Sequence, residues 1–440
     1  MLLCYRLRPT FPPNNLVMFR SLISELDQRK LIAQVSDRGG LEAHLNDASR
    51  TLYCGFDPTA DSLHIGNLVP LLMLRRFQLH GHRPIALVGG ATGLIGDPSF
   101  KGTERVLNER EVVESWVAPI REQVSRFVDL TGNNAAIVVD NLDWTRNLDV
   151  ITFLRDVGKH FSVNAMMQKD SVKSRLSQHE SGISFTEFSY MLLQSMDYME
   201  LCKRYDCTLQ IGGSDQWGNI TAGMDLVRRT LSRESFALTV PLVTKADGTK
   251  FGKTEAGSVW LDARRTSPFV FYQFWLNTAD ADVLRYLGAF TFVDLDEIAH
   301  LGASLADSPE KRDAQRRLAQ EVTHLVHGVE GVRSAERISS VLFGGEVRDL
   351  TIDDLEQLSL DGMSVSSIDD GENGLVAVLA SSPLATSRSA ARKLIQSGGV
   401  QINGVGVADA EAVLSRETAL FGRYQLIRRG KKAWHMAVHG

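Results

Sequence analysis

Short apolar runs and amphipathic stretches alternate from about residue 52 to residue 244. Apolar runs that end at Gly, Asp or Ser are typical of buried strands, and the stretches between them carry apolar residues at helical spacing. The runs are 52–56, 84–89, 136–139 and 207–211. Strands that alternate with helices predict an α/β domain built on a parallel sheet, to which we assign residues 18–266.

The pattern changes after this domain. Residues 267–345 are rich in Leu, Glu and Arg and poor in Gly, which predicts a helical domain. Residues 346–373 are acidic and rich in Gly and Ser, a composition typical of a linker. Residues 374–440 combine a capped helix at 387–396 with strand-like runs, so we expect a small α+β domain.

The amino terminus carries two arginines and a short apolar start, but neither a longer apolar core nor a small-residue cleavage site. This excludes a typical secretory signal and leaves a transit peptide as the weaker alternative. A helical pattern begins at Phe19. We therefore expect residues 1–17 to be a disordered extension, with Met18 as an alternative start.

Composition narrows the class of protein. The formal charge of −5 over 440 residues argues against coating of nucleic acid by bulk charge, so any RNA contact must be a local patch. The 4 cysteines are too few for a disulfide framework and lack the spacing of a zinc site. No apolar run approaches the roughly 20 residues of a membrane span. We expect a cytoplasmic protein without a membrane segment.

A polar turn and a predicted helix follow the first strand, and Asp61 or Ser62 could cap that helix. The order strand, turn, helix directs backbone N–H groups and the positive end of a helix dipole at an anion. Thr59 and His64 would add side-chain donors, and Gly66 would leave room for a base or ribose. This segment predicts a nucleotide site.

A second basic segment places Lys250 and Lys253 in a loop punctuated by glycines. Such a loop could fold over a pyrophosphate, where its charges matter most as negative charge grows in the transition state. Together the two segments predict ATP binding and attack on the α-phosphate. Each alone has a simpler interpretation, because a single His near a helix start usually caps the helix or packs in a core, and a lone basic loop is usually a solvated turn.

The last segment concentrates positive charge in a net-acidic chain. It carries basic residues on one helix and on a ribbon interleaved with Tyr424 and Trp434. Seven of these residues form a candidate RNA-binding face, with a solvated surface as the alternative: Arg388, Arg392, Lys393, Arg428, Arg429, Lys431 and Lys432.

Six blocks in the same order resemble bacterial tyrosyl-tRNA synthetases, which are class I aminoacyl-tRNA synthetases. The resemblance runs from about Leu22 to the carboxyl end, and the tail is similar to a small RNA-binding fold shared by a ribosomal protein and pseudouridine synthases. His64-Ile-Gly-Asn67 stands for the family's HIGH motif and Lys250-Phe-Gly-Lys253-Thr254 for KMSKS. The blocks are 53–59, 64–67, 89–99, 184–194, 210–219 and 250–254.

The resemblance implies a Rossmann-like catalytic domain and a reaction in two steps. The tyrosine carboxylate attacks the α-phosphorus of ATP and releases pyrophosphate, and the tyrosyl group then passes to the 3′ end of tRNA. ATP would arrive with Mg²⁺ held mainly by its phosphates, with no tightly bound cofactor and no dedicated metal site. The family works as a homodimer with tRNA lying across both subunits, so we expect the same here.

The family's functional residues transfer to matching positions of this chain. The resemblance implies that the transition-state phosphates are contacted by Thr59, His64, Lys101, Arg105, Lys250 and Lys253. It implies a tyrosine subsite formed by Tyr53 and Asp197, which read the hydroxyl, by Asp97, Tyr190 and Gln194, which hold the ammonium group, and by Gln216 near the carboxylate. It implies an ATP subsite formed by Cys54, Gly55, Asp57, His64, Gly66, Asn67, Asp215 and Lys253.

The helix around Tyr190 has a second interpretation. Spacings of four and three residues place Tyr190, Gln194 and Asp197 on one helical face. Without the resemblance, Tyr190 and Met191 would be taken as core residues.

Two positions depart from the family pattern. Asn67 replaces the second His of HIGH, and a carboxamide can still hydrogen-bond a ribose. Pro70 stands early in the same helix, where it removes a donor and presses on the carbonyl of Gly66. We predict a local kink there and not a broken helix.

Two rival functions stay open at this point. A tryptophanyl synthetase or small nucleotidyltransferase would share the fold, but Tyr53 with Asp197 and the basic tail argue against both. A catalytically silent RNA-binding relative would have no need of His64, Lys250 and Lys253.

Overall fold

The structure is a computed structural model, and it describes residues 21–99, 107–169, 172–173, 183–249, 251–254, 257–368 and 373–440. Of Lys253 and Thr254 it describes the backbone alone. The expected extension 1–17 lies outside the described residues. The chain forms two compact units, of which unit 1 comprises Met1–Asp262 with Thr278–Leu325 and unit 2 comprises Ala263–Asn277 with Val326–Gly440.

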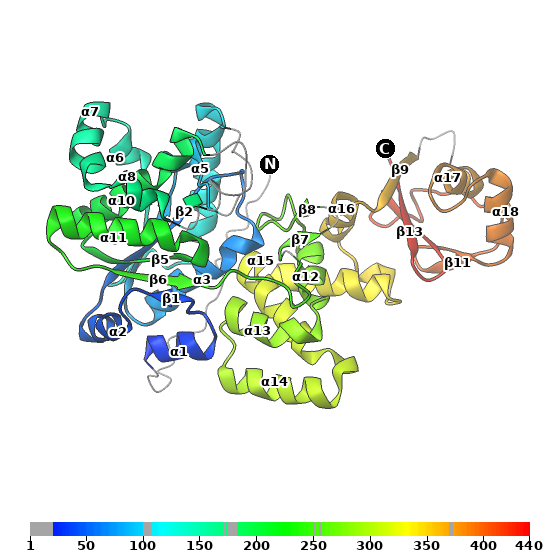
Figure 1. The fold of residues 1–440 in the computed structure, drawn as a ribbon. Coiled ribbons are helices and arrows are strands. Elements are labelled where there is room, and N and C mark those ends of the chain that lie inside the picture. The colour runs from blue at the N-terminus through cyan, green and yellow to red at the C-terminus, as the bar shows by residue number, and fades with distance from the viewer. Residues whose placement is uncertain are drawn as a thin grey trace. The chain divides into compact units, whose positions relative to one another are not determined.

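Unit 1 contains the predicted parallel sheet, so the α/β assignment is confirmed (Figure 1). Its six strands lie in the order β1-β6-β5-β2-β3-β4, and all neighbours are parallel except β1 and β6. The four predicted strands correspond to β2, β3, β4 and β5, whereas β1 and the fully buried β6 were not predicted. The strands are β1 Gln34–Val35, β2 Thr51–Phe56, β3 Arg83–Val88, β4 Ile137–Asp140, β5 Cys207–Gly213 and β6 Phe236–Val240.

Helices cover the sheet because packing against it removes their apolar faces from water. Helices α10 and α11 pack on each other and on β5, while α3 packs on β2 and β3. Helix α10 begins where the Ser184 side chain accepts from Glu187 N–H and ends at Asp206, whose φ is 54°. The helices of this part are α1 Leu22–Gln28, α2 Arg38–Asp47, α3 Leu68–Leu79, α4 Thr92–Ile95, α5 Arg110–Ser125, α6 Leu142–Thr145, α7 Val150–Thr152, α8 Val163–Met167, α10 Phe185–Tyr205 and α11 Trp217–Leu231.

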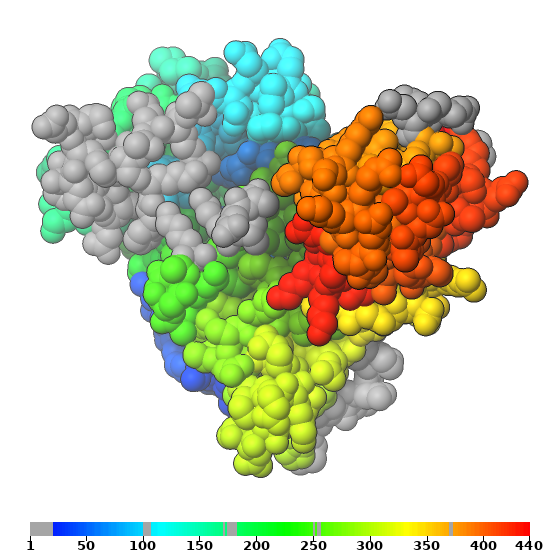
Figure 2. Space-filling view, turned by 90° about the vertical axis from the view of Figure 1, so that its right-hand side faces the viewer, coloured from blue at the N-terminus to red at the C-terminus, as the bar shows by residue number. Residues whose placement is uncertain are grey.

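The predicted helical region 267–345 is helical, but it is divided between the two units. Helices α13 (Asp280–Phe290) and α14 (Leu295–Asp307) belong to unit 1, whereas α12 (Pro268–Leu276) belongs to unit 2. Helix α15 (Asp313–Leu342) is interrupted at Gly328, whose φ of 73° and ψ of −176° are not helical. Helix α14 has no buried residue and lies at the surface, where it forms the yellow-green lower part of Figure 2.

Unit 2 contains a five-stranded sheet in the order β11-β10-β12-β13-β9. Its neighbours are antiparallel except β13 and β9, which are parallel. Two apolar clusters, one with Leu379 and Ile395 and one with Leu358 and Met436, form its core. The elements are α16 Ile352–Leu360, β9 Ser364–Ile368, α17 Leu375–Ser381, α18 Arg388–Gln396, β10 Val400–Ile402, β11 Val405–Val407, β12 Tyr424–Arg429 and β13 Ala433–His439.

The segment expected to be a linker differs from that expectation. Residues 352–368 form α16 and β9, and Leu355 and Leu358 are buried against Leu426 and Met436. Their spacing of three places both leucines on one face of a helix. A capping box joins Thr351 and Asp354, which are the N-cap and the third residue of α16. These local signals outweigh the acidic, Gly-rich and Ser-rich composition.

The packing of α16 on α15 depends on Asp354, which is buried. Its Oδ2 accepts from Thr351 N at 2.9 Å and from Arg337 Nε at 2.9 Å, and its Oδ1 accepts from Ser334. We predict that Asp354→Ala lowers the free energy of unfolding by about 2–3 kcal/mol, because it removes a cap and leaves buried donors unpaired. Urea unfolding measures the change. Asp353→Ala, in the exposed position next to it, is the control, and equal effects of the two variants would contradict this role.

Candidate active site

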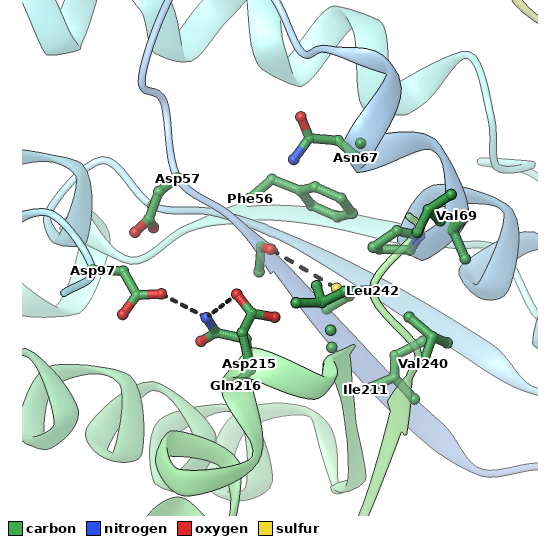
Figure 3. A pocket seen from close by; sticks show the side chains of 18 of the residues that line it. Phe56, Asp57, Asn67, Val69, Asp97, Ile211, Asp215, Gln216, Val240 and Leu242 are labelled. Carbon is green, nitrogen blue, oxygen red and sulfur yellow. Dashed lines mark hydrogen bonds between the residues drawn. The ribbon is translucent and has the colours of Figure 1, made fainter. Parts of the chain in front are cut away.

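A cavity of about 620 Å³ lies beyond the carboxyl ends of β2, β3, β5 and β6. Ligands on parallel sheets bind at this edge. Its lining includes Thr59 and every residue that the sequence analysis assigned to the tyrosine and ATP subsites, except Lys253, whose side chain is not described. In Figure 3, Asp57, Asp97 and Gln216 lie on one side of the cavity, and Val69, Val240 and Leu242 lie on the other. The cavity therefore has a polar side and an apolar side.

The first motif forms a tight turn at the mouth of this cavity. His64 is the N-cap of the 3₁₀ turn Ile65–Asn67, its Nδ1 accepts from Gly66 N at 3.0 Å, and Asn67 Oδ1 accepts from His64 N at 3.1 Å. The residues expected to cap this helix, Asp61 and Ser62, therefore do not do so. Because Nδ1 is an acceptor, we assign the ring proton to Nε2, which makes His64 a donor.

Pro70 lies in the first turn of α3. It is the third residue of that helix, after the 3₁₀ turn, so its missing N–H belongs to the first turn, where no intrahelical acceptor exists. The chain changes from a 3₁₀ turn to an α-helix between Asn67 and Leu68, and the kink near the ribose stays a prediction. Gly66 is needed for another reason: a Cβ there would lie 2.8 Å from His64 Cε1.

A buried carboxyl group lies at the inner end of the cavity. Asp197 Oδ2 accepts from Asn141 Nδ2 at 3.0 Å and Oδ1 accepts from Trp144 Nε1 at 2.8 Å. Burial raises the pKa of Asp197 to about 7, although both hydrogen bonds act in the opposite direction. The group is therefore held firmly but ionises only near neutral pH.

Three buried polar atoms around this carboxyl lack a hydrogen-bonding partner among the described residues. They are the Tyr53 hydroxyl, Gln194 Oε1 and Gln210 Oε1, and all three residues line the cavity. Burial, with the Asp197 charge as a smaller cause, raises the pKa of Tyr53, so its hydroxyl is protonated. Buried groups without partners are rare in native proteins and mark places where a ligand completes the hydrogen bonding.

The polar side of the cavity is built from a second chain of hydrogen bonds. Tyr190 donates from its hydroxyl to Asp57 Oδ2 at 2.7 Å, and Thr92 Oγ1 donates to Asp57 Oδ1 at 2.6 Å. Asp57 was assigned to ATP and Tyr190 to tyrosine, so the structure joins the two predicted subsites through this pair. A Cβ at Gly89 would lie 1.9 Å from Asp57 Oδ1, which explains why a glycine is required there.

Two further carboxylates face the same space. Gln216 Nε2 donates to Asp97 Oδ2 at 2.5 Å and to Asp215 Oδ2 at 3.2 Å (Figure 3). Burial raises the pKa of Asp215. On the floor of the cavity, burial raises the pKa of the Cys54 thiol to about 12, so this thiol is neutral. None of the described lining residues is Lys or Arg, so this part of the site attracts cations.

Four residues that shape the site were not predicted from the sequence. Asn141 and Trp144 hold Asp197, Thr92 holds Asp57, and Gln210 lines the cavity. A signal existed for Asn141, because it directly follows β4, and residues after parallel strands face the ligand edge.

The backbone brings the two predicted motifs together. Ile65 N donates to Val259 O at 2.9 Å, and Leu261 N donates to Leu63 O at 2.9 Å. A Cβ at Gly252, whose φ is 77°, would lie 2.6 Å from Ile65 Cγ2. The segment after the lysine loop, which includes the hairpin of β7 (Lys253–Thr254) and β8 (Gly257–Ser258), is thus paired with the first motif. Lys101, Arg105 and Lys250 lie outside the described residues.

The seven basic residues of the tail lie on two neighbouring features of unit 2. Arg388, Arg392 and Lys393 are on α18, and the other four are at the turn between β12 and β13. Gly430 N in that turn donates to Gly399 O, just after α18, at 3.2 Å. Arg392 pairs with Glu411 at 2.7 Å, and Arg429 Nη1 donates to Leu384 O at 2.7 Å. Arg428 Nε donates to Gly430 O at 2.8 Å, so these three cations have internal partners.

Within the described residues, no group of three or more His, Cys, Asp or Glu side chains could hold a metal ion. Among the helices of that same part of the chain, none is both long enough and apolar enough to cross a bilayer.

Comparison with known proteins identifies the family of this chain. The family model of class I tRNA synthetases for tryptophan and tyrosine matches residues 46–344, and a model of the tyrosine–tRNA ligase C-terminal domain matches residues 354–437. The tyrosine–tRNA ligase of Aliivibrio fischeri is 59% identical over 418 residues, which are 95% of this chain and 98% of that protein. The ligase of Geobacillus kaustophilus is 56% identical over 417 residues, 94% of this chain and 99% of that protein.

The chain belongs to the tyrosine–tRNA ligases of class I.

Solved structures place the fold in the same class. A C-terminally truncated mitochondrial tyrosyl-tRNA synthetase of Aspergillus nidulans has a TM-score of 0.66 at 30% identity and covers 74% of this chain and 95% of its own. The tyrosyl-tRNA synthetase of Archaeoglobus fulgidus has a TM-score of 0.53 at 15% identity over 72% of this chain and 99% of its own, a likeness of fold alone. The predicted family, the ligase function and the fold class are confirmed, and the tryptophanyl alternative is not supported.

The raised pKa of Asp197 gives the free protein a pH-dependent stability. Its folded pKa of about 7 lies above the ordinary 3.8, so the folded state keeps a proton that the unfolded chain has lost. The Asp197 contribution to the free energy of unfolding should therefore fall as pH rises from about 4 to about 7, by up to about 4 kcal/mol. Urea unfolding of Asp197→Asn should lack this fall. Parallel pH profiles of the variant and the natural chain would contradict the prediction.

Proposed function

We propose that the cavity binds L-tyrosine and ATP side by side and that the tyrosine carboxylate attacks the α-phosphorus there, before the tyrosyl group passes to the 3′ end of tRNA(Tyr). The attacking carboxylate needs no base, so positioning and charge stabilisation carry the first step. The observation that supports the proposal best is the buried Tyr53 hydroxyl, which has no hydrogen-bonding partner in the part of the chain that the structure describes and lines the same cavity as Asp197.

Tyrosine is recognised at the inner end of the cavity. Its phenol hydroxyl pairs with the Tyr53 hydroxyl and the Asp197 carboxyl, which Asn141 and Trp144 hold in place. Phenylalanine would leave these groups buried without a partner, and that cost is the basis of rejection. The specificity is therefore built from a site that is incomplete without the ligand hydroxyl.

The tyrosine ammonium group binds on the polar side. Asp97, Tyr190 and Gln194 surround it, and the Asp57 carboxylate, held by Tyr190 and Thr92, adds negative charge. Gln216 lies near the substrate carboxylate, and it would donate to that group by giving up one of its two bonds, to Asp97 or to Asp215. Like charges crowded together repel, and the ammonium group relieves that repulsion.

ATP occupies the part of the cavity next to the first motif. Gly55 and Gly66 leave space for the ribose and base, with Cys54, Asn67 and Asp215 close to the ribose and the apolar side, including Leu242, against the base. His64, as an Nε2–H donor, and Thr59 bind the phosphates in the transition state. Lys101, Arg105, Lys250 and Lys253 supply the positive charge that the described lining lacks. Mg²⁺ enters with ATP, held mainly by phosphate oxygens.

The tail of unit 2 binds tRNA. Its exposed cations at the turn after β12, together with Arg388 and Lys393, form a phosphate-binding face. Arg392, Arg428 and Arg429 contribute less, because each already has an internal partner.

The working enzyme is a cytoplasmic homodimer. Five large apolar side chains of α7, η2 (Phe153–Val157) and α8 are 43–70% exposed, and such a group of apolar side chains marks a protein interface. They are Val150, Ile151, Leu154, Val163 and Met167. Cys54, Cys202 and Cys207 are free thiols and not part of a disulfide, as expected in a reducing compartment.

Substitution of Tyr53 tests the specificity site. Tyr53→Phe should reduce the preference for tyrosine over phenylalanine about tenfold, because it removes one hydrogen bond to the ligand. It should not lower the stability of the free enzyme, because it also removes an unpaired hydroxyl. Tyrosine-dependent ATP–pyrophosphate exchange, with phenylalanine and tryptophan as competitors, measures the first effect and thermal unfolding the second.

Tyr198→Phe is the matched control. The Tyr198 ring packs edge to face on Tyr53 at 5.3 Å, but its hydroxyl donates to Phe236 O at 2.8 Å and the residue does not line the cavity. This variant should lose stability and keep its discrimination. Unchanged discrimination in Tyr53→Phe would refute the role of Tyr53, and absence of exchange activity in the natural chain would favour a silent RNA-binding protein.

The dimer proposal predicts the effect of charge in the apolar patch. The double variant Ile151→Asp, Leu154→Asp should sediment as a monomer, because two carboxylates would be desolvated in the interface. Analytical ultracentrifugation at micromolar concentration measures this. Val405→Asp, at an exposed apolar position of unit 2, should leave the dimer intact. A monomeric natural chain, or a double variant that still dimerises, would overturn the proposal.

A further inference from the structure

Helix α13 holds the start of the lysine loop by three side chains. Both Asp282 carboxylate oxygens lie 3.1 Å from Ala246 N, which donates to them. The Tyr286 hydroxyl donates to Thr244 O at 2.9 Å, and Arg285 Nη2 donates to the same carbonyl at 2.5 Å. Asp282 is 3% exposed, so this is a buried anchor. The loop therefore leaves β6 along a fixed path.

The same helix holds the loop a second time, five residues further on. The Phe251 ring stacks on Phe290 at 5.2 Å and meets the edge of Tyr286 at 5.1 Å. Gly248, with a φ of 78°, lies between the two anchored parts of the loop, and Gly252, with a φ of 77°, directly follows Phe251. Phe251 also lines the cavity. The ring thus fixes the loop between Lys250 and Lys253.

Helix α13 is itself tied to the helix that follows the first motif. Arg76 of α3 donates to Gly288 O at 3.3 Å and to Thr291 O at 2.5 Å, and Arg29 donates to Val293 O at 3.0 Å. These carbonyls lie at and just beyond the carboxyl end of α13, where unpaired acceptors and the helix dipole favour cations. Glu25 joins the two arginines, at 2.7 Å from Arg29 and 3.1 Å from Arg76.

We propose that Asp282 and Tyr286 are positioning residues for adenylate formation, which act by holding the lysine loop in place relative to the His64 motif. The inference rests on the proposed role of Lys250 and Lys253. Ordering a loop costs conformational entropy, and anchors that order it beforehand remove that cost from the transition state. Loss of an anchor slows adenylate formation and leaves tyrosine binding unchanged, because the anchors do not contact the tyrosine subsite.

Two variants test the anchor with little change in volume. Asp282→Asn weakens the acceptor for Ala246 N, and Tyr286→Phe removes the bond to Thr244 O while keeping the aromatic stack. Single-turnover formation of tyrosyl-adenylate should slow about tenfold in each, with a raised KM for ATP and a Kd for tyrosine within twofold of the natural enzyme. Asp280→Asn is the matched control, because Asp280 is on the same helix but accepts from Gln315 of α15 at 2.5 Å.

A double-mutant cycle separates positioning from a structural role. In the background Lys250→Ala, Lys253→Ala, which should itself be slow, Asp282→Asn should have less than a twofold further effect. An undiminished tenfold effect in that background, or tyrosine affinity that falls in parallel with the rate, would overturn the anchor. If Asp282→Asn does not fold, Tyr286→Phe decides alone.

The outcome distinguishes this inference from the proposed function. A slow lysine variant together with Asp282→Asn and Tyr286→Phe at the natural rate would overturn the anchor and leave the lysine roles standing. A lysine variant at the natural rate would overturn both.

Discussion

The active site depends on backbone pairing between two segments that are far apart in the sequence. Ile65 N with Val259 O and Leu261 N with Leu63 O join the first motif to the segment that follows β8, after the lysine loop. Because these bonds are made by backbone groups, they hold the two motifs in register whichever side chains bind substrate. The cavity, the turn at His64 and the loop around Phe251 all lie against this pairing. The proposed role of Lys250 and Lys253 depends on this pairing, because it sets where the backbone of the loop lies relative to His64.

The second constraint is the crowding of carboxyl groups in a cavity whose described lining has no Lys or Arg. Asp57, Asp97, Asp197 and Asp215 all line it, and burial raises the pKa of Asp197 and Asp215. In the free enzyme this arrangement is unfavourable, and each carboxylate is held by donors such as Tyr190, Gln216 and Asn141. In the proposed function, the ammonium group and the phenol of the substrate complete this hydrogen bonding and offset the negative charge.

Much of the site could be predicted from the sequence, but its internal contacts could not. The strands ending at Phe56 and near Gly213 place Asp57 and Asp215 at the ligand edge, and helical spacing places Tyr190, Gln194 and Asp197 on one face. Nothing local indicates that Trp144 would hold Asp197, or that Tyr190 would bond to Asp57, because those partners are separated by 53 and 133 residues. The segment near residue 355 was expected to be a linker because of its composition. It is folded because Leu355 and Leu358 are buried in an apolar cluster of unit 2, which composition does not indicate.

By itself the sequence determined the parallel α/β sheet, the family and the residue types of the reaction, because apolar periodicity and short motifs are local properties of the chain. Tertiary structure alone decided which of these residues touch. It divided the helical region after residue 266 between two units. It also paired Arg392 and Arg429 with groups of unit 2, and it brought Asp282 of α13 to the backbone at the start of the lysine loop. Hydrogen bonds and burial between distant segments depend on how the whole chain packs, so local pattern cannot specify them.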